Sequence, residues 1–289
     1  MYIMFFNTIL FIALGVLMVL AAHGIANRRM GKKHPELLEM PDKVWGSSAF
    51  IIRRAGLYVS VLLGTFAVSQ NIGDAAFAKD SIIDALTPML LLESGLGLVS
   101  ALVFVFTALR SVDKFILSNV DNDNAVVNNN AAVGITECAI FVATGFVSYG
   151  ALLGEGHITS AWVFFLIGQA VFIALGYLME HVIHPSHNAK SDIEKGCIPS
   201  ALIISSMLLV VAMFVKNGIA GDFYGYSQDI PYFLKMLGIQ FGLFVGYLFL
   251  IEPILLAGMK LKPTALNGAV VRFAMQLMIA ASIVYNVSL

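Results

Sequence analysis

Residues 128–154 read NNNAAVGITECAIFVATGFVSYGALLG, and this stretch contains the pattern that decides the fold. From Cys138 to Gly154 it has no Asp, Glu, Lys or Arg. A helix needs about 20 mostly apolar residues to cross ~30 Å of hydrocarbon. The stretch lacks the polar alternation of a barrel strand, and a backbone in lipid must otherwise form a helix. We therefore expect a membrane-spanning helix at about residues 131–153.

The same kind of run occurs eight times along the chain. The runs without Asp, Glu, Lys or Arg are 1–27, 55–73, 94–109, 138–154, 156–179, 196–215, 236–251 and 273–289. The shorter runs must extend past a charge to cross the bilayer, which gives spans at about 3–23, 49–71, 85–109, 131–153, 159–180, 198–217, 232–255 and 266–287. The sequence therefore predicts an all-α integral membrane protein with eight transmembrane helices.

The composition excludes several other classes of protein. Of the 289 residues, 59% are hydrophobic and 12% are charged, whereas a soluble domain has about 25% charged residues. The net charge of −1 provides no basic surface for nucleic acid. The longest polar connections, 27–48 and 110–130, are too short to form catalytic domains, and the sequence has no phosphate-binding loop or zinc-protease helix motif. We therefore expect no enzymatic activity and no cofactor.

The positive charges favour one orientation. Of the 17 Lys and Arg residues, all but Lys79, Lys216 and Lys235 lie in or beside the connections that follow spans one, three, five and seven. Because basic connections stay in the cytoplasm, we expect both termini on the outer side. The first span has no Lys or Arg before its apolar core, so we interpret it as a retained helix rather than a signal peptide.

Short similarities indicate that a pair of helices is repeated. The even-numbered spans begin with small or polar residues, at 48–50, 130–132, 197–201 and 267–269. Gly176-Tyr177-Leu178 in span five recurs as Gly246-Tyr247-Leu248 in span seven, and the same offset relates Cys197 to Asn267. A unit with two crossings enters the membrane in the same direction each time, so such repeats are parallel. We expect four parallel two-helix repeats around a common axis, forming two four-helix halves at 1–156 and 157–289.

The stretch 128–137 resembles the opening motif of the domain-of-unknown-function 350 family, also called uncharacterised protein family 0719. In that motif an Asn-x-Ala sequence precedes a glycine or an acidic residue about two turns later. Residues 195–201, KGCIPSA, resemble a degenerate copy with Cys197 in place of the asparagine. Because family members are short four-helix bacterial proteins, the resemblance implies a duplicated form in the bacterial inner membrane. Together with the orientation expected from the positive charges, this predicts periplasmic termini. The neighbourhood of the family's genes, with membrane-stress proteins and ATP-grasp ligases, implies envelope maintenance.

Charges inside the predicted spans are candidates for function, because each costs roughly 2.5–3.5 kcal/mol on insertion scales. Glu137 lies about two turns inside its span, and the repeat brings Arg53, Arg54 and Arg272 to a similar depth. We expect these residues to form one charged layer, in which Glu137 pairs with Arg272 or with Arg54. The layer is either a structural ion pair between repeats, a substrate or ion site, or a set of arginines that reach the interface.

Glu93 and Glu252 are candidate ion or proton sites. Glu93 precedes a small-residue stretch, SGLG, that permits close helix approach, but a helix beginning near 87–88 would leave Glu93 at the outer interface. Glu252 precedes Pro253, which frees the carbonyl group of Phe249 to bind a cation. A position at the cytoplasmic interface explains Glu252 equally well.

His181 and His184 are weak candidates for a metal site, because histidines three residues apart share one helix face. Pro185 ends the helix beside them, so interfacial histidines near lipid headgroups are the alternative, and we expect no metal. The DNDN run at 121–124 lacks the remaining ligands of a calcium loop and is interpreted as a solvated turn.

Four cations follow the first span and form a basic cluster: Arg28, Arg29, Lys32 and Lys33. Such a cluster attracts anionic lipid or an acidic peripheral protein. One hypothesis is therefore a noncatalytic, membrane-embedded partner or scaffold in envelope maintenance or stress, with the bilayer and peripheral membrane-stress proteins as partners and no nucleic acid. The alternative is a channel or carrier for a small ion or proton that uses the intramembrane carboxylates. The sequence does not indicate an oligomeric state.

Overall fold

The computed structural model describes residues 2–35, 41–116, 122–154, 157–183, 189–221 and 223–287. Every regular element among them is a helix, and eight segments are long and apolar enough to cross a membrane. Seven of these segments are α1 (Tyr2–Lys33), α4 (Ser48–Lys79), α6 (Pro88–Ile116), α8 (Ala131–Leu153), α9 (Ile158–Ile183), α11 (Ile198–Ile219) and α14 (Leu266–Asn286). The eighth consists of α12 (Tyr226–Gly246), the π-helix η1 (Tyr247–Ile251) and α13 (Glu252–Gly258). The eight predicted spans are confirmed.

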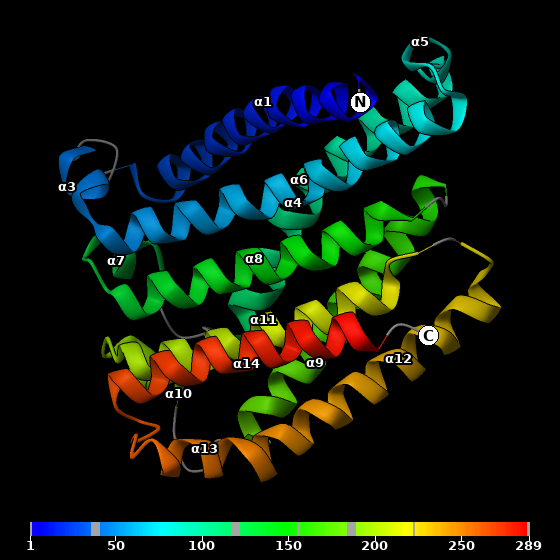
Figure 1. Ribbon diagram of the computed structural model, residues 1–289. Coiled ribbons are helices and arrows are strands. Elements are labelled where there is room, and N and C mark those ends of the chain that lie inside the picture. Colours follow the sequence, from blue (N-terminus) through cyan, green and yellow to red (C-terminus); the bar gives the residue numbers. More distant parts are fainter. Residues whose placement is uncertain are drawn as a thin grey trace.

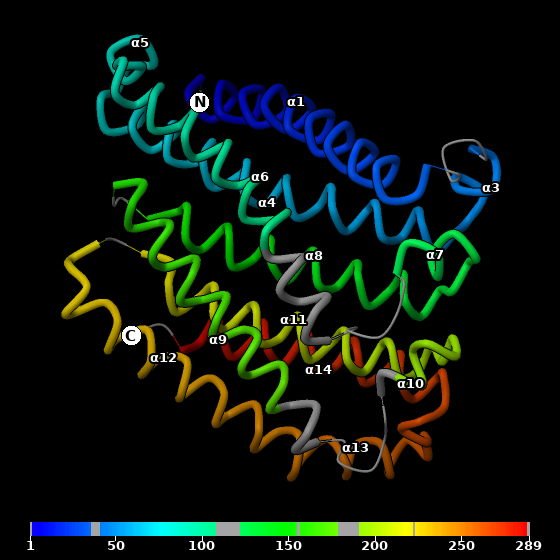
Figure 2. The backbone as a smooth tube through the Cα atoms, turned by 180° about the vertical axis from the view of Figure 1, so that it is seen from behind, coloured from blue at the N-terminus to red at the C-terminus, as the bar shows by residue number. Residues whose placement is uncertain are grey.

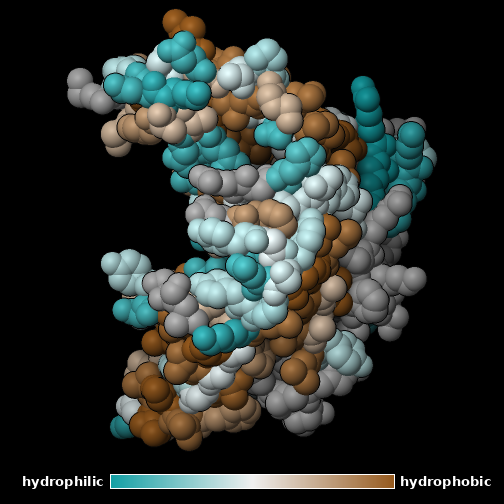
Figure 3. All heavy atoms as spheres, turned by 90° about the vertical axis from the view of Figure 1, so that its right-hand side faces the viewer, coloured by the Kyte–Doolittle hydropathy of each residue, from teal (hydrophilic) through white to brown (hydrophobic). Residues whose placement is uncertain are grey.

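Short helices lie in the connections and define the two ends of the bundle. The helices α3 (Pro41–Gly46), α7 (Asn122–Val127) and α10 (Ala189–Glu194) precede α4, α8 and α11 and lie at one end of the molecule (Figure 1). We call this the basic end. The opposite end, here called the termini end, contains α5 (Ile82–Ala85) and both chain termini. Hydrophilic and hydrophobic patches alternate over the termini end (Figure 3).

The spans form two layers (Figures 1 and 2). The helices α4, α8, α11 and α14 pack side by side in one row, in that order. The helix α6 packs against both α4 and α8, α9 against α8 and α11, and α12 against α11 and α14, while α1 covers the free side of α4. The helix pairs therefore follow one another in a line. The prediction that they surround a common axis is wrong.

Small residues let the helices of the row approach closely. A Cβ atom added at Gly56 of α4 would lie 2.6 Å from Cα of Cys138 in α8. A Cβ atom added at Gly150 of α8 would lie 2.8 Å from the carbonyl oxygen of Lys216 in α11. Because lipid is as apolar as the helix surface, close backbone packing of this kind supplies much of the association between membrane helices. These contacts make α8 the centre of the molecule.

Two asparagines of the 128–137 stretch join successive helices at the basic end. The Oδ1 atom of Asn129 accepts hydrogen bonds from the hydroxyl of Ser48 at 2.8 Å and from the backbone N–H of Ala49 at 3.2 Å, so it caps α4. Asn130 caps α8, and its Nδ2 donates to the carbonyl oxygen of Glu194 at 2.9 Å, at the end of α10. These bonds fix where α4 begins relative to the connection before α8, and where α8 begins relative to the end of α10.

Candidate functional site

Two groups of charged and polar side chains lie between the helices. The first charge cluster consists of Lys33, Arg53, Asp123 and Glu137 and joins α1, α4, α7 and α8. The second charge cluster consists of Ser206, Glu252, Arg272 and Gln276 and joins α11, α13 and α14.

Arg53 is the centre of the first charge cluster. Its Nη2 atom lies 2.7 Å from Oδ1 of Asp123, and its Nε atom lies 3.2 Å from Oε2 of Glu137. The other carboxylate oxygen of Asp123 accepts a hydrogen bond of 3.0 Å from Nζ of Lys33. Glu137 is 1% exposed, so its charge is compensated inside the protein. The cluster therefore holds α1, α4, α7 and α8 together.

Asp123 is the acidic group of this cluster that lies outside the spans. Burial raises the pKa of Asp123, but the charges of Arg53 and Lys33 outweigh burial and lower the pKa from 3.8 to about 2. Asp123 is thus ionised at neutral pH. It belongs to α7 and forms ion pairs, so the interpretation of this run as a solvated turn is wrong for Asp123; residue 121 lies outside the described residues.

Arg54 takes part in a separate network. Its Nη2 donates a hydrogen bond of 2.7 Å to Oδ1 of Asn27, and its guanidinium lies 4.9 Å from the centre of the Phe50 ring. The Nδ2 atom of Asn27 lies 2.8 Å from Nε2 of His23, whose Nδ1 lies 2.7 Å from the hydroxyl of Tyr58. This network connects α1 to α4 and directs Arg54 toward α1.

The second charge cluster is almost completely buried. Nε of Arg272 lies 2.7 Å from Oε1 of Glu252, and Nε2 of Gln276 donates a hydrogen bond of 2.8 Å to Oε2. The hydroxyl of Ser206 then donates to Oε1 of Gln276 at 2.6 Å. Glu252 is 3% exposed and Arg272 is 6% exposed. Both carboxylate oxygens of Glu252 thus have partners inside the protein.

The π-helix η1 turns Glu252 inward. Pro253 has no N–H group to donate to the carbonyl of Phe249, and the backbone N–H of Glu252 donates to the carbonyl of Tyr247, five residues earlier. A single π-turn inserts one extra residue and changes the direction of the side chains that follow. The neighbouring Ile254 is 72% exposed, whereas Glu252 is buried.

The structure divides the predicted charged layer between the two charge clusters and the separate network of Arg54. Arg54, Glu137 and Arg272 each lie seven residues after the N-cap of their helix, which matches the expected similarity in depth. The two predicted pairs of Glu137, with Arg272 or with Arg54, are wrong, because Glu137 pairs with Arg53 and Arg272 pairs with Glu252. Glu137 and Arg272 do not meet because α11 lies between α8 and α14 in the row. Arg54 lies on α4, next to α8, but its side chain points toward Asn27 of α1.

Glu93 lies in a different environment, at the termini end. Its helix α6 begins at Pro88, as the interface interpretation of Glu93 assumed, and Glu93 is half-buried. It lines a cavity of about 70 Å³ together with Ser94 of the same helix, Asn71 of α4 and Leu152 of α8. The structure therefore brings Glu93 together with neither charge cluster.

The basic cluster is exposed at the basic end. Arg28, Arg29 and Lys32 line an open hollow of about 580 Å³, together with Ile25 and Lys33. Lys33 also binds Asp123, so it contributes to the first charge cluster as well.

The histidine prediction falls outside the structure. His184 and the side chain of His181 lie outside the described residues. Among the residues that the structure does describe, no group of three His, Cys, Asp or Glu could hold a metal ion.

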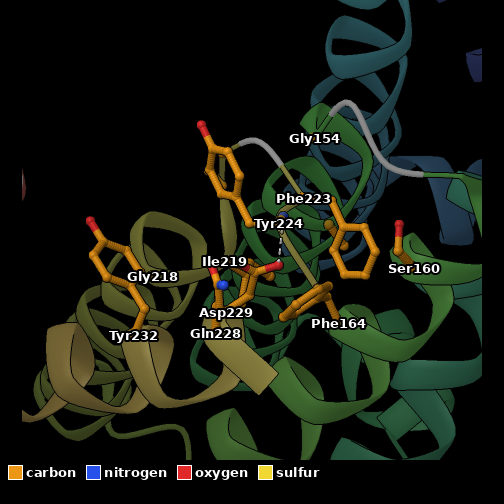
Figure 4. Close-up of a pocket in the computed structure, with 13 residues that line it drawn as sticks. Gly154, Ser160, Phe164, Gly218, Ile219, Phe223, Tyr224, Gln228, Asp229 and Tyr232 are labelled. Atoms are coloured by element: carbon orange, nitrogen blue, oxygen red, sulfur yellow. Dashed lines mark hydrogen bonds between the residues drawn. The ribbon is translucent and has the colours of Figure 1, made fainter. Parts of the chain in front are cut away.

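A cavity of about 390 Å³ at the termini end was not predicted from the sequence (Figure 4). It lies between the ends of α8 and α11 and the starts of α9 and α12. Its walls include Phe164, Phe223, Tyr224, Asp229 and Tyr232. The segment 223–232, FYGYSQDIPY, is dense in aromatic residues, and this was the available signal for the cavity. Phe164, which lines the same cavity, is about 60 residues away in the sequence.

The family model of a Domain of Unknown Function (DUF350) matches residues 2–152. This match covers more than half of the chain, from α1 to the end of α8, and includes the first charge cluster. No curated protein and no solved structure matches the chain. The second charge cluster and the cavity beside Asp229 involve helices that follow the matched region.

Proposed function

The chain belongs to the DUF350 family, and we propose that this member is a membrane-embedded scaffold without catalytic activity. We place it in a bacterial inner membrane, in envelope maintenance or stress. The observation that carries the proposal is the internal pairing of the buried carboxylates: Glu137 with Arg53, and Glu252 with Arg272 and Gln276. Such pairs hold helices together rather than receive a mobile ion.

The pairing opposes the alternative of a channel or carrier. A transport carboxylate must exchange its ion with water, and intramembrane carboxylates of this type face water-filled cavities. Glu137 and Glu252 are 1% and 3% exposed, and an arriving cation would have to displace the part-exposed Arg53 from Glu137 and the buried Arg272 from Glu252. Breaking a buried pair in this way costs about 3–5 kcal/mol.

We further propose that residues 157–289 are a second copy of the half formed by residues 1–156. The family match ends at residue 152, yet the later helices continue the same row. The helix α9 packs against α8 and α11 as α6 packs against α4 and α8, and a short helix precedes each of α4, α8 and α11. By the positive-inside rule, the basic end faces the cytoplasm and both termini face the periplasm.

The surface that serves the scaffold is the basic cluster. Arg28, Arg29 and Lys32 are exposed around one hollow, and each cation near an anionic membrane surface contributes about 1 kcal/mol. Together they would strengthen the binding of anionic lipid, or of an acidic peripheral membrane-stress protein, by roughly 100-fold.

An ion-flux experiment tests the proposal against its alternative. Wild-type protein and Glu137→Gln are reconstituted into vesicles, and proton, sodium and potassium fluxes are measured with ion-sensitive dyes. We expect wild-type flux equal to that of empty vesicles, while Glu137→Gln lowers stability without changing flux. Wild-type flux above background that disappears in Glu137→Gln would establish the carrier and reject the scaffold.

A second experiment tests the binding surface. The variant Arg28→Gln/Arg29→Gln/Lys32→Gln is compared with the control Lys195→Gln/Lys260→Gln/Lys262→Gln, which removes three exposed cations elsewhere. Retained phosphatidylglycerol is counted by native mass spectrometry at two salt concentrations. We expect the first variant to retain less lipid and to lose the salt dependence, while the control behaves as wild type. Equal retention by both variants would show that the basic cluster is not a binding surface for anionic lipid.

A further inference from the structure

The geometry of the chain at the termini end creates the cavity beside Asp229. The chain leaves α11 through Gly221 and Gly225, whose φ angles are 145° and 118°, values that favour glycine. A Cβ atom added at Gly154 would lie 2.7 Å from the carbonyl oxygen of Gly221, so the ends of α8 and α11 touch. The cavity, of about 390 Å³, lies between these ends and the starts of α9 and α12. This volume lies in the range of roughly 300–1,000 Å³ that is typical of small-molecule sites.

A carboxylate is fixed in this cavity. The Oδ2 atom of Asp229, in the first turn of α12, accepts hydrogen bonds of 3.1 Å from the backbone N–H groups of Tyr224 and Gly225 (Figure 4). None of the ion pairs formed among the described residues includes Asp229. Its negative charge is held in place by the backbone and is available to a cation that enters the cavity.

Aromatic side chains line the same cavity as the carboxylate. The rings of Phe164 and Phe223 lie 6.2 Å apart at 77°, and both pack against Tyr226, at 6.1 Å and 5.0 Å. Phe164 is 8% exposed, and Tyr224 and Tyr232 complete the wall (Figure 4). Ring faces attract cations within about 6 Å, and aromatic cages of this kind recognise quaternary ammonium groups. Interfacial aromatic belts are common, but a belt does not require a carboxylate among the rings.

The cavity beside Glu93 provides a comparison. It lies one helix pair earlier, between α4, α6, α8 and α9, and shares Gly154 with the larger cavity. It contains a carboxylate but no aromatic side chain, and its volume of about 70 Å³ is too small for an organic cation. The aromatic lining thus belongs to the Asp229 cavity and not to its neighbour.

We propose that the cavity formed by Phe164, Phe223, Tyr224, Asp229 and Tyr232 binds an organic ammonium group. The group is carried by the headgroup of an amine-bearing lipid or by a free amine at the termini end. The carboxylate neutralises the positive charge, and the ring faces contact the carbon atoms around the nitrogen. This site is independent of the scaffold proposal, because it shares no residue with the basic cluster or with either charge cluster.

The test uses choline as the probe. The full chain is placed in phosphatidylglycerol nanodiscs, and choline is titrated in by calorimetry, with the neutral isostere 3,3-dimethyl-1-butanol as the control ligand. We expect saturable binding of choline and none of the isostere. Asp229→Asn keeps an acceptor oxygen for the two backbone N–H groups and should weaken binding at least tenfold. Phe164→Leu should weaken it several-fold, and the matched control Glu93→Gln should leave it unchanged.

The lipid composition distinguishes the two sources of the ammonium group. In phosphatidylethanolamine nanodiscs, weaker choline binding would show that the lipid headgroup occupies the cavity, and unchanged binding would assign the site to a free amine. The proposal is overturned if wild-type protein shows no saturable choline binding, or if Asp229→Asn and Phe164→Leu bind as wild type. If Asp229→Asn does not fold, as judged by its thermal unfolding, Phe164→Leu decides alone.

Discussion

The second charge cluster predicts strong energetic coupling between Glu252 and Arg272. The perturbations are Glu252→Gln, Arg272→Met and the double variant. The two charges lie 2.7 Å apart, and both side chains are less than one-tenth exposed. Each single variant therefore leaves the partner's charge in the protein interior, whereas the double variant removes both charges together.

The expected losses of unfolding free energy follow from the burial of these two side chains. Removing one member of a buried pair costs about 3–5 kcal/mol, because the other charge remains uncompensated. Arg272→Met should lie at the lower end, since Glu252 keeps its hydrogen bond from Gln276. Replacing a whole buried pair by uncharged side chains of similar volume is often neutral, so the double variant should cost about 1 kcal/mol or less. The two single costs together are about 6 kcal/mol or more and the double cost is about 1 kcal/mol or less, so the expected coupling free energy is at least about 5 kcal/mol.

The assay is reversible unfolding in mixed micelles with increasing dodecyl sulfate, followed by the fluorescence of Trp45 and Trp162. The control is Lys235→Met, which removes an exposed cation from α12 and should change the unfolding free energy by about 0.5 kcal/mol at most. Additive effects of the two single variants would refute the reasoning, because additivity means that the two charges do not compensate each other in the folded protein.

Three further predictions concern α4 and its neighbours. Arg53→Gln should destabilise the protein more than Glu137→Gln does, because Arg53 pairs with both Asp123 and Glu137. In Glu137→Gln, Arg53 still pairs with Asp123. The same unfolding assay compares the two variants, and equal losses of unfolding free energy would contradict the geometry. The folded-state pKa of Asp123 is about 2, below 3.8, so its stabilisation is present above pH 3.8 and is lost as the pH falls toward 2. Asp123→Asn should reduce this loss, measured as unfolding between pH 6 and pH 2. Gly56→Ala should cost roughly 1–3 kcal/mol through overpacking, whereas Gly95→Ala, which has open space for its Cβ, should be tolerated in a thermal-unfolding comparison.

The number and approximate limits of the spans could be predicted from the sequence. Charged residues are costly in lipid, so the charge-free runs marked where the chain crosses the membrane. The depth of a residue follows from its distance from the helix start, which is why Arg54, Glu137 and Arg272 have equivalent positions in their helices. The limits of a span and the depth of its residues both follow from a single segment of the sequence, without knowledge of the neighbouring helices.

The direction in which a side chain points could not be predicted in the same way. Arg53 and Arg54 are neighbours, yet about 100° of rotation around the helix sends Arg53 to Asp123 and Glu137 and Arg54 to Asn27. Which partner each one meets depends on the neighbouring helices, and the hydrophobic pattern of a membrane helix does not mark its protein-facing side as clearly as that of a soluble helix does.

Glu252 shows a second limit of prediction from the sequence. Its proline neighbour predicted a disturbed helix, and the structure has one, but the disturbance is a π-turn that keeps the segment continuous. An ordinary α-helical projection of this segment does not allow for the rotation that brings Glu252 to Arg272. Similarly, the repeat predicted helix pairs that cross in the same direction, but the common axis predicted with them was wrong, because the repeat does not determine whether the pairs close into a ring or extend in a row.

The row architecture places the first charge cluster and the two interhelical cavities at opposite ends of the molecule. At the basic end, successive helices are joined by the Asn129 and Asn130 caps and by the first charge cluster. At the termini end, two successive grooves contain cavities, and each cavity has an acidic residue from the first two turns of its bordering helix, Glu93 in one and Asp229 in the other. Binding chemistry can therefore differ from groove to groove without loss of the bonds that hold the row together. Substitutions at Asp229 should change ligand binding and leave stability intact. Substitutions at Arg53 should lower stability and leave ligand binding at the Asp229 cavity intact.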